Sequence, residues 1–418
     1  MTPPSHDLAL DAPLAASPAF DAARLPAHAR WALRLLQGFR DGTLDLTLPD
    51  GQRTRFGHGA PHAQMTLANW NVIGAALKSG DIGFAESYIA GDWASADPAR
   101  VLQVFIRNRA AAEQVIYGSA WGTLLHRLTH LLNRNTRRQA KKNIHAHYDL
   151  GNDFYALWLD PTMTYSAALF PQAQVDPHAP ATEDEVVAAQ HAKYGRVLAE
   201  LRLAPGSRVL EIGCGWGGMA EAAARAGHAV AGLTLSREQL VYARERLTRQ
   251  GFAADLRLQD YRDERGVYDG VASIEMFEAV GEQYWDDYFA LLARLLKPGG
   301  RACIQTIEIA DALFDRYRRS TDFIQQYIFP GGMLPCPAEF VRRAERAGLR
   351  VEQRFAFGPH YAKTLATWRA SFAQRVDAVR ALGFDERFLR IWNFYLAYCE
   401  AAFAEGNTDV AQYTLVRA

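Results

Sequence analysis

Cysteine is scarce in this sequence: the 418 residues contain four, and they stand far apart. None belongs to a Cys-x-x-Cys pair, and none has a histidine at the spacing of a metal ligand. Disulfide frameworks and structural zinc sites need paired or closely grouped ligands. We therefore expect neither disulfide bonds nor a bound metal ion.

An excess of charge of either sign is also missing. Lysine plus arginine equals aspartate plus glutamate, with 46 of each. A balanced chain creates no global positive field that would attract nucleic acid. We expect no nucleic-acid partner, and any attraction to an anionic surface must come from a local group of charges.

Long apolar runs are absent as well. No stretch approaches the uninterrupted run of about 18 apolar residues that a membrane-spanning helix requires. The N-terminal residues include Asp7, Asp11 and Asp21 instead of a basic segment followed by an apolar run, so no secretory signal is predicted. The sequence indicates a cytoplasmic protein, soluble or peripherally attached to a membrane.

What the chain does have is length and an apolar content of 49%, enough for two domains. Residues 1–25 are rich in alanine and proline without periodicity, and we expect a mobile leader there. Residues 26–112 begin with apolar residues at helical spacing, followed by alternation over 44–48 and a turn at 49–51. This pattern predicts a small N-terminal α+β domain.

A basic segment follows at residues 113–145. No acidic residue occurs between Gln114 and Tyr148, whereas leucines recur at helical spacing among arginines and lysines. This pattern predicts an amphipathic helix. A linker helix with its leucines packed on a domain and its arginines in solvent is the favoured interpretation. A helix lying on anionic lipid headgroups is the alternative.

Helices and strands alternate through residues 146–418. The first clear unit is a strand at 208–212, a glycine turn, a helix that stops at Gly227 and a strand at 229–235. Such βαβ units build a parallel sheet. Further strands are predicted at 254–258, 270–274 and 302–307, with helices at 190–201, 238–249 and 284–296. The fold class is therefore α/β, with a Rossmann-like, mostly parallel sheet.

The glycine turn reads Glu211-Ile-Gly-Cys-Gly-Trp-Gly-Gly218. Gly213, Gly215 and Gly218 satisfy Gly-x-Gly-x-x-Gly, which would also suit a dinucleotide. A nicotinamide cofactor requires an acid near the end of the second strand, yet that strand ends Gly232-Leu-Thr-Leu-Ser236. The pattern favours S-adenosylmethionine, whose amino group Glu211 could hold while the glycines allow close approach of the backbone.

Six segments follow one another in a recognisable order. They are His147-Tyr-Asp-Leu-Gly-Asn-Asp-Phe-Tyr155, Asp160-Pro-Thr-Met-Thr-Tyr-Ser166, Glu211-Ile-Gly-Cys-Gly-Trp-Gly217, Gly232-Leu-Thr-Leu-Ser236, Phe277-Glu-Ala-Val-Gly281 and Tyr327-Ile-Phe-Pro-Gly331. Together they resemble the cyclopropane-fatty-acyl-phospholipid synthases and the related mycolic acid methyltransferases. The resemblance implies that residues 146–418 form a class I S-adenosylmethionine-dependent methyltransferase domain. It also implies that residues 26–112 assist lipid binding and dimerisation, which predicts a homodimer.

By this resemblance, the enzyme transfers a carbon from S-adenosylmethionine to the cis double bond of an unsaturated fatty acyl chain in a phospholipid, giving a cyclopropane fatty acid. Peripheral contact with a membrane surface is expected for such a substrate. The resemblance also implies which residues contact the cofactor, with Thr234 and Gln239 serving the ribose in place of an acid. The set is Tyr165, Ser166, Gly213, Gly215, Gly217, Thr234, Gln239 and Tyr261.

The reaction requires a base, because the methylated double bond becomes a carbocation that loses a proton as the ring closes. Family members bind a bicarbonate ion for this step. The resemblance places its ligands at Glu278, Ile307 and Tyr361, and at two further positions where Ala167 and Gln305 replace the family's cysteine and histidine. Two side-chain ligands of the anion are thus changed, although Gln305 retains a hydrogen-bond donor.

These replacements leave alternatives for the chemistry. Glu308 stands where many relatives have glycine, so Glu278 or Glu308 could act as the base, or a hydride shift could give a methyl-branched or methylene product. Cys399 matches the cysteine often assigned to the family's active site. A pocket-lining role is the favoured interpretation of Cys399 over nucleophilic catalysis, since methylation of an alkene needs no enzyme nucleophile.

Two other classes of function remain open from the sequence. One is a small-molecule methyltransferase on the same fold, and the other is a lipid-binding protein without catalysis. The motifs do not specify the acyl length, the double-bond position or the headgroup.

Overall fold

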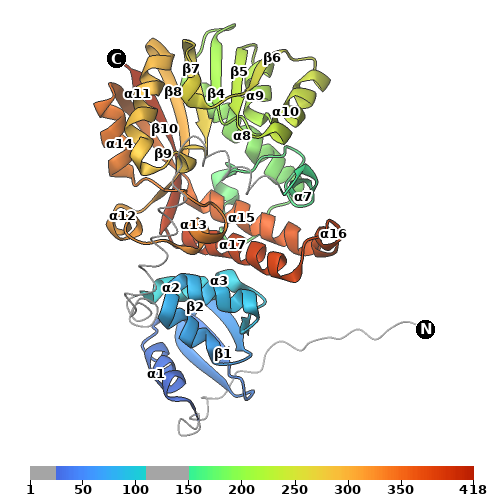
Figure 1. Cartoon of the computed structure of the whole chain (residues 1–418), viewed down its shortest axis with the longest axis vertical. Coiled ribbons are helices and arrows are strands. Elements are labelled where there is room, and N and C mark those ends of the chain that lie inside the picture. The colour runs from blue at the N-terminus through green and yellow to red at the C-terminus, as the bar shows by residue number, and fades with distance from the viewer. Residues whose placement is uncertain (1–24, 110–149) are drawn as a thin grey trace, which may run out of the picture.

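The computed structural model describes residues 25–109 and 150–418, which form two units (Figure 1). The predicted basic helix at 113–145 lies outside the described residues, as do residues 1–24 of the predicted leader. A small N-terminal unit rests on the helices of a larger α/β unit (Figure 1). In the described part of the chain, no helix is both long and apolar enough to cross a membrane.

The N-terminal unit is built around a small antiparallel sheet. Its elements are α1 (Ala27–Leu36), β1 (Asp41–Thr47), β2 (Arg53–Leu67), α2 (Asn71–Ala90), β3 (Trp93–Ala94) and α3 (Pro98–Arg107). The strands lie in the order β1-β2-β3. Leu44 and Leu46 alternate with more exposed residues along β1 and are buried, as a strand with one covered face requires. The Asp97 side chain caps α3 by accepting a hydrogen bond from the Arg100 backbone.

The larger unit consists of a seven-stranded sheet flanked by helices. Its strands are β4 (Arg208–Ile212), β5 (Ala229–Thr234), β6 (Ala254–Leu258), β7 (Tyr268–Ile274), β8 (Leu296–Ile309), β9 (Leu349–Ala356) and β10 (Thr408–Arg417). Its α-helices are α7 (Asn152–Ala156), α8 (Glu183–Leu201), α9 (Gly218–Arg225), α10 (Arg237–Arg249), α11 (Trp285–Leu295), α12 (Asp311–Tyr317), α13 (Phe323–Tyr327), α14 (Pro337–Arg346), α15 (Gly358–Gln374), α16 (Val376–Ala381) and α17 (Glu386–Ala404).

The strands of this sheet lie in the order β6-β5-β4-β7-β8-β10-β9. Strands β4 to β8 are parallel, while β10 runs antiparallel between β8 and β9. The predicted Rossmann-like, mostly parallel sheet is therefore confirmed. From β4 the chain adds β5 and β6 on one side, and it then returns to add β7 and β8 on the other side. The strand order therefore reverses at β4. In open α/β sheets, ligands bind beyond the carboxyl ends of the strands at such a reversal.

Helices cover both faces of the sheet. Leu210 of β4 packs in one apolar cluster with Phe289 of α11 and Phe340 of α14. Its neighbour Val209 packs in another cluster with Tyr194 of α8 and with residues of α9 and α10. A strand covered on both sides has apolar residues at successive positions, which explains the apolar run in β4.

Helix α17 connects the two units. It packs against α15 in the larger unit and against α2 and α3 in the smaller one. Arg390 donates a hydrogen bond to the Tyr88 carbonyl at 2.8 Å, and the Tyr398 hydroxyl donates to the Asp81 carboxylate at 3.1 Å. Apolar residues of both units form one continuous core. The small unit is thus packed against the same helices that lie below the sheet's carboxyl edge (Figure 1).

Candidate active site

A glycine turn connects β4 to α9 at the reversal point. Gly213, Gly215 and Gly217 have φ values of 84°, 48° and 84°, in the left-handed region that favours glycine. A Cβ atom on Gly213 would lie 2.9 Å from Met276 Cγ, so a side chain has no room there. Gly217 instead faces α10, where a Cβ would lie 3.0 Å from the Cβ of Ala243. Because glycines occupy these positions, the backbone of the turn can adopt this conformation and can lie close to the adjacent cavity.

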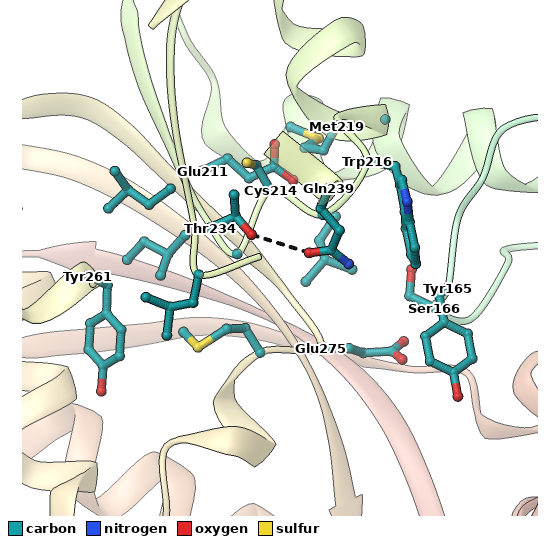
Figure 2. A pocket seen from close by; sticks show the side chains of 18 of the residues that line it. Tyr165, Ser166, Glu211, Cys214, Trp216, Met219, Thr234, Gln239, Tyr261 and Glu275 are labelled. Carbon is teal, nitrogen blue, oxygen red and sulfur yellow. Dashed lines mark hydrogen bonds between the residues drawn. The ribbon is translucent and has the colours of Figure 1, made fainter. Parts of the chain in front are cut away.

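The cavity lies at the carboxyl ends of β4, β5 and β7 (Figure 2). Except for Gly217, all of the residues predicted to contact S-adenosylmethionine line it. They are Tyr165, Ser166, Glu211, Gly213, Gly215, Thr234, Gln239 and Tyr261. The fold therefore brings together segments that are up to about a hundred residues apart in the chain.

Glu211, near the end of β4, carries a carboxylate that suits a positively charged ligand. In the described part of the chain, its Oε2 atom is buried without a hydrogen-bond partner. Burial raises the pKa of Glu211 to about 8. An ammonium group in the cavity would supply the missing partner and favour the charged carboxylate. The amino group of S-adenosylmethionine fits this requirement.

The end of β5 gives the cavity neutral polar groups in place of an acid. Thr234 Oγ1 donates a hydrogen bond to Gln239 Oε1 at 3.2 Å, and the Gln239 amide nitrogen faces away from Thr234 (Figure 2). Ser236 caps α10 by accepting a hydrogen bond from the Gln239 backbone, which fixes the start of this helix at the cavity. Hydroxyl and amide groups can both bind ribose hydroxyls. This end of the cavity therefore fits the ribose of S-adenosylmethionine.

A carboxylate that the sequence analysis did not single out also lines the cavity. Glu275 directly follows β7, and its side chain points towards Tyr165 and Ser166 (Figure 2). Its φ of 50° is uncommon for a residue with a side chain, and Met163 in the same cavity also has a φ of 50°. An acidic residue directly after a strand next to the reversal point is the signal that could have identified Glu275.

Three neutral donors surround the Glu275 carboxylate. The Ala167 backbone nitrogen and Gln305 Nε2 donate to Oε1 at 2.9 Å and 2.7 Å, and the Tyr361 hydroxyl donates to Oε2 at 2.7 Å. Removal from bulk solvent raises the pKa of Glu275, while Lys193 and these hydrogen bonds oppose the rise. The predicted residues Gln305 and Tyr361 therefore meet at Glu275.

Lys193 of α8 places a cation-forming group beside both cavity carboxylates. Its side chain is fully buried, and its Nζ donates a hydrogen bond to Ser166 Oγ at 2.6 Å. Burial lowers the pKa of Lys193 to about 7, and the charges of Glu275 and Glu211 oppose this decrease. The lysine therefore favours the deprotonated forms of both glutamates. Sequence reasoning missed it because it lies in the middle of a helix.

Glu278 and Ile307, both predicted to act in catalysis, are bound to each other. The Ile307 backbone nitrogen and the Thr306 hydroxyl donate to Glu278 Oε1, the latter at 3.1 Å. Burial and the neighbouring Glu275 charge raise the pKa of Glu278 to about 8. Its surroundings therefore favour the neutral form of Glu278. Neither Glu278 nor Ile307 is among the residues that line the cavity.

The remaining predicted catalytic residues, Glu308 and Cys399, also lie outside the cavity lining. Arg354 donates to one oxygen of Glu308, and the Tyr413 hydroxyl donates to the other at 2.6 Å. Both partners belong to strands β9 and β10, which the sequence analysis did not predict. Cys399 packs against the large apolar core, and burial raises the pKa of its thiol.

Aromatic rings form a wall that starts at the cavity. The ring centroid of Tyr165 lies 5.3 Å from that of Trp368 and 5.4 Å from that of Tyr155. The Tyr165 hydroxyl contacts the Tyr395 hydroxyl at 2.5 Å, which fixes the ring at the cavity edge. The electron-rich faces of aromatic rings attract positive charge. Among these rings Tyr165 lines the cavity, so its ring can stabilise a cationic intermediate there.

The strand order, the glycine turn and the polar groups around it define a class I S-adenosylmethionine-dependent methyltransferase. A family model described as mycolic acid cyclopropane synthetase matches residues 135–413. The chain belongs to this family, and its cosubstrate is S-adenosylmethionine.

Relatives and solved structures agree with this assignment. The tuberculostearic acid methyltransferase UfaA1 of Mycobacterium tuberculosis is 43% identical over 347 residues, 81% of this chain and 80% of the relative. The cyclopropane-fatty-acyl-phospholipid synthase of Escherichia coli is 34% identical over 365 residues, 86% of this chain and 89% of that one. The crystal structure of mycolic acid cyclopropane synthase CmaA1 with SAH and CTAB aligns with a TM-score of 0.60 at 32% identity, covering 66% of this chain and 98% of that chain. The predicted resemblance is confirmed, and the protein is a methyltransferase or cyclopropane synthase of fatty acyl lipids.

Proposed function

We propose that the protein transfers a carbon from S-adenosylmethionine to the cis double bond of an unsaturated acyl chain in a phospholipid, giving a cyclopropane fatty acid. The observation that carries the proposal is the aromatic wall that begins at Tyr165, on the edge of the cofactor cavity. An isolated double bond becomes cationic when it is methylated, so its site must be apolar and must stabilise positive charge. The 34% identity to a cyclopropane-fatty-acyl-phospholipid synthase supports the phospholipid substrate.

Each part of the cavity has a role in this reaction. S-adenosylmethionine supplies an electrophilic methyl group when it is bound. Glu211 binds its amino group, and Thr234 and Gln239 bind its ribose, which fixes the donor relative to the wall. Tyr165, which lines the cavity, stabilises the acyl cation with its ring, and the buried Trp368 packs against Tyr165 from behind.

A second product is favoured by one observation. The relative with 43% identity is named a tuberculostearic acid methyltransferase. The alternative product is therefore a methylated acyl chain without a ring. A hydride shift in the cation, followed by loss of a proton, would give a methylene group. The same donor, the same lipid class and the same aromatic wall would serve this product.

A phospholipid substrate implies contact with a membrane surface. We propose a cytoplasmic enzyme that binds the membrane peripherally and acts as a homodimer, as the family resemblance predicts. Co-sedimentation with vesicles and light scattering of the free enzyme measure these two properties separately.

Release of S-adenosylhomocysteine tests the proposed function. The full-length protein is incubated with S-adenosylmethionine and vesicles of dioleoyl phosphatidylethanolamine and phosphatidylglycerol. Matched vesicles with fully saturated palmitoyl chains are the control, and soluble amines and phenols test the small-molecule alternative. We expect release with the unsaturated vesicles alone. Equal release with saturated vesicles, or turnover of only a soluble acceptor, would contradict the proposal.

A further inference from the structure

The position of Glu275 conflicts with a bicarbonate ion as the base. The family resemblance makes Tyr361 a ligand of that ion, and Ala167 and Gln305 stand at the positions of two further ligands, the family's cysteine and histidine. In this structure, all three donate their hydrogen bonds to the Glu275 carboxylate. A second anion at this point would compete for the same donors and would lie against a negative charge. The site therefore does not fit bicarbonate.

A chain of hydrogen bonds fixes the orientation of the Gln305 amide. Arg196 donates to Gln412 Oε1 at 2.6 Å, and Gln412 Nε2 donates to Gln305 Oε1 at 3.0 Å. Both glutamines are fully buried, so their amides have no water with which to exchange these bonds. Since Arg196 can only donate, each amide must turn its oxygen towards the arginine and its nitrogen towards Glu275. Gln305 therefore presents a fixed hydrogen-bond donor to the site, and this donor requires an acceptor, which the Glu275 carboxylate supplies.

The other carboxylates near the cavity lack this combination of features. Glu278 binds the Ile307 backbone and does not line the cavity, and Glu308 is held by Arg354 and Tyr413. Glu211 lies on the side of the glycine turn, where the amino group of the donor binds. Glu275 alone among these four lies on the cavity side next to Tyr165, where the aromatic wall begins (Figure 2).

We propose that the Glu275 carboxylate is the proton acceptor of this enzyme, built into the chain in place of a dissociable anion. The inference rests on the proposed function. The electron pair of the double bond forms a bond to the methyl carbon as the sulfur–carbon bond breaks, and that bond's electrons stay on sulfur. Glu275 then takes a proton from the added methyl group, and the electrons of that carbon–hydrogen bond close the ring.

The proton afterwards leaves Glu275 for solvent, which restores the carboxylate. The three donors hold the Glu275 carboxylate in one orientation. The nearby Lys193 favours the charged form of Glu275, which is the form that accepts the proton. If a hydride shift precedes proton loss, the same acceptor gives a methylene group. The proposal therefore concerns the base and does not depend on which of the two products forms.

Two substitutions test the proposal in the full-length protein. Glu275→Gln keeps the shape of the side chain and removes the base. Glu275→Gly opens the space between the three donors and suits a φ of 50°, so this variant is expected to fold. Glu245→Gln, at an exposed position of α10, is the matched control. Release of S-adenosylhomocysteine is measured with dioleoyl vesicles in buffer freed of carbon dioxide, and again with added bicarbonate or acetate.

We expect the wild type and Glu245→Gln to be equally active with and without bicarbonate. Glu275→Gln should lose activity by roughly 10²–10⁴-fold, the usual contribution of a positioned base, while its affinity for S-adenosylmethionine is kept. Glu275→Gly should be inactive alone and should regain activity when bicarbonate or acetate fills the space.

Two results would overturn the assignment of the base while leaving the proposed function intact. One is a wild type that is active on unsaturated vesicles only when bicarbonate is present. The other is a Glu275→Gln or Glu275→Gly protein that binds S-adenosylmethionine and works within tenfold of the wild type without an added anion. A wild type that never turns over unsaturated vesicles would instead refute the proposed function.

Discussion

Gln305 Nε2 lies 2.7 Å from Glu275 Oε1, and the Gln412 amide binds the opposite end of Gln305 at 3.0 Å. The second contact fixes the first, because an amide whose oxygen is already occupied presents its nitrogen. Gln305 therefore acts on the reaction through Glu275, as a positioning residue. The sequence predicted that Gln305 stands at the position of a bicarbonate ligand, but it did not identify Glu275 as the hydrogen-bond partner of Gln305.

Substitution of Gln305 by methionine should shift the pH dependence of turnover. A donor to a carboxylate stabilises its charged form, so losing this donor raises the pKa of Glu275 further. We expect the acidic limb of the kcat profile to move to higher pH, with a lower kcat at neutral pH and an unchanged affinity for S-adenosylmethionine. Gln250→Met, at an exposed position, is the control. An acidic limb identical to that of the wild type would show that Gln305 does not act through Glu275.

Binding of S-adenosylmethionine should release a proton near pH 7. Glu211 has a pKa of about 8 in the free protein and is therefore mostly neutral there, whereas an ammonium partner favours the carboxylate. Affinity should accordingly fall as the pH is lowered from 8 to 6. Calorimetry in two buffers of different ionisation enthalpy measures the proton. The Glu211→Gln variant should bind more weakly and without proton release, and a variant that still releases the proton would assign it to another group.

Two glycines separate the effect of a strained backbone from the effect on the cofactor. Gly215 and Gly251 both have positive φ values, and a Cβ on either would meet no protein atom within 4 Å. Substitution of either glycine by alanine should lower the stability of the protein by about 1 kcal/mol, because alanine disfavours the left-handed backbone conformation. Only Gly215 lines the cavity, so Gly215→Ala should lower the affinity for S-adenosylmethionine at least about tenfold through contact with the ligand. Equal affinities of the two variants would remove Gly215 from the cofactor site.

An acid pair between the two units should make stability depend on pH. Asp322 caps α13, and burial together with nearby Asp81 of α2 raises its pKa to about 7. The neutral form therefore stabilises the fold at low pH, and this contribution is lost as the pH rises through 7. Asp322→Asn keeps the cap and removes the charge. Relative to the wild type, its melting temperature should rise by roughly 2–4 °C between pH 5.5 and 8.5, and a constant difference would show that Asp322 is not the titrating group.

The sheet could be predicted from the sequence because its central strands are short apolar runs bounded by glycines. Strand β4 begins at Arg208 and ends at Ile212, where the pattern placed it. The prediction did not extend to β9 and β10, whose pairing depends on partners far along the chain, such as Tyr413 opposite Ile304. This omission also hid the partners of Glu308, which made that residue a candidate for the base.

The residues of the candidate site also fall into those that the sequence could identify and those that it could not. Gly213 and Glu211 belong to one continuous turn, so local spacing identified them. The role of Glu275 depends on donors from Ala167, Gln305 and Tyr361, which come from three distant segments. No local pattern records such a meeting, because only the folded chain brings these groups within hydrogen-bond distance.

The product formed on an unsaturated phospholipid tests the central claim most directly. The wild-type protein is given S-adenosylmethionine with a fully deuterated methyl group and dioleoyl phospholipid vesicles, and the acyl chains are analysed by mass spectrometry and deuterium NMR. We predict an acyl chain that has gained one carbon, has lost one of the deuterium atoms and shows the upfield signals of a cyclopropane ring. Vinylic signals would indicate the methylene product, and an unmodified acyl chain would contradict the account.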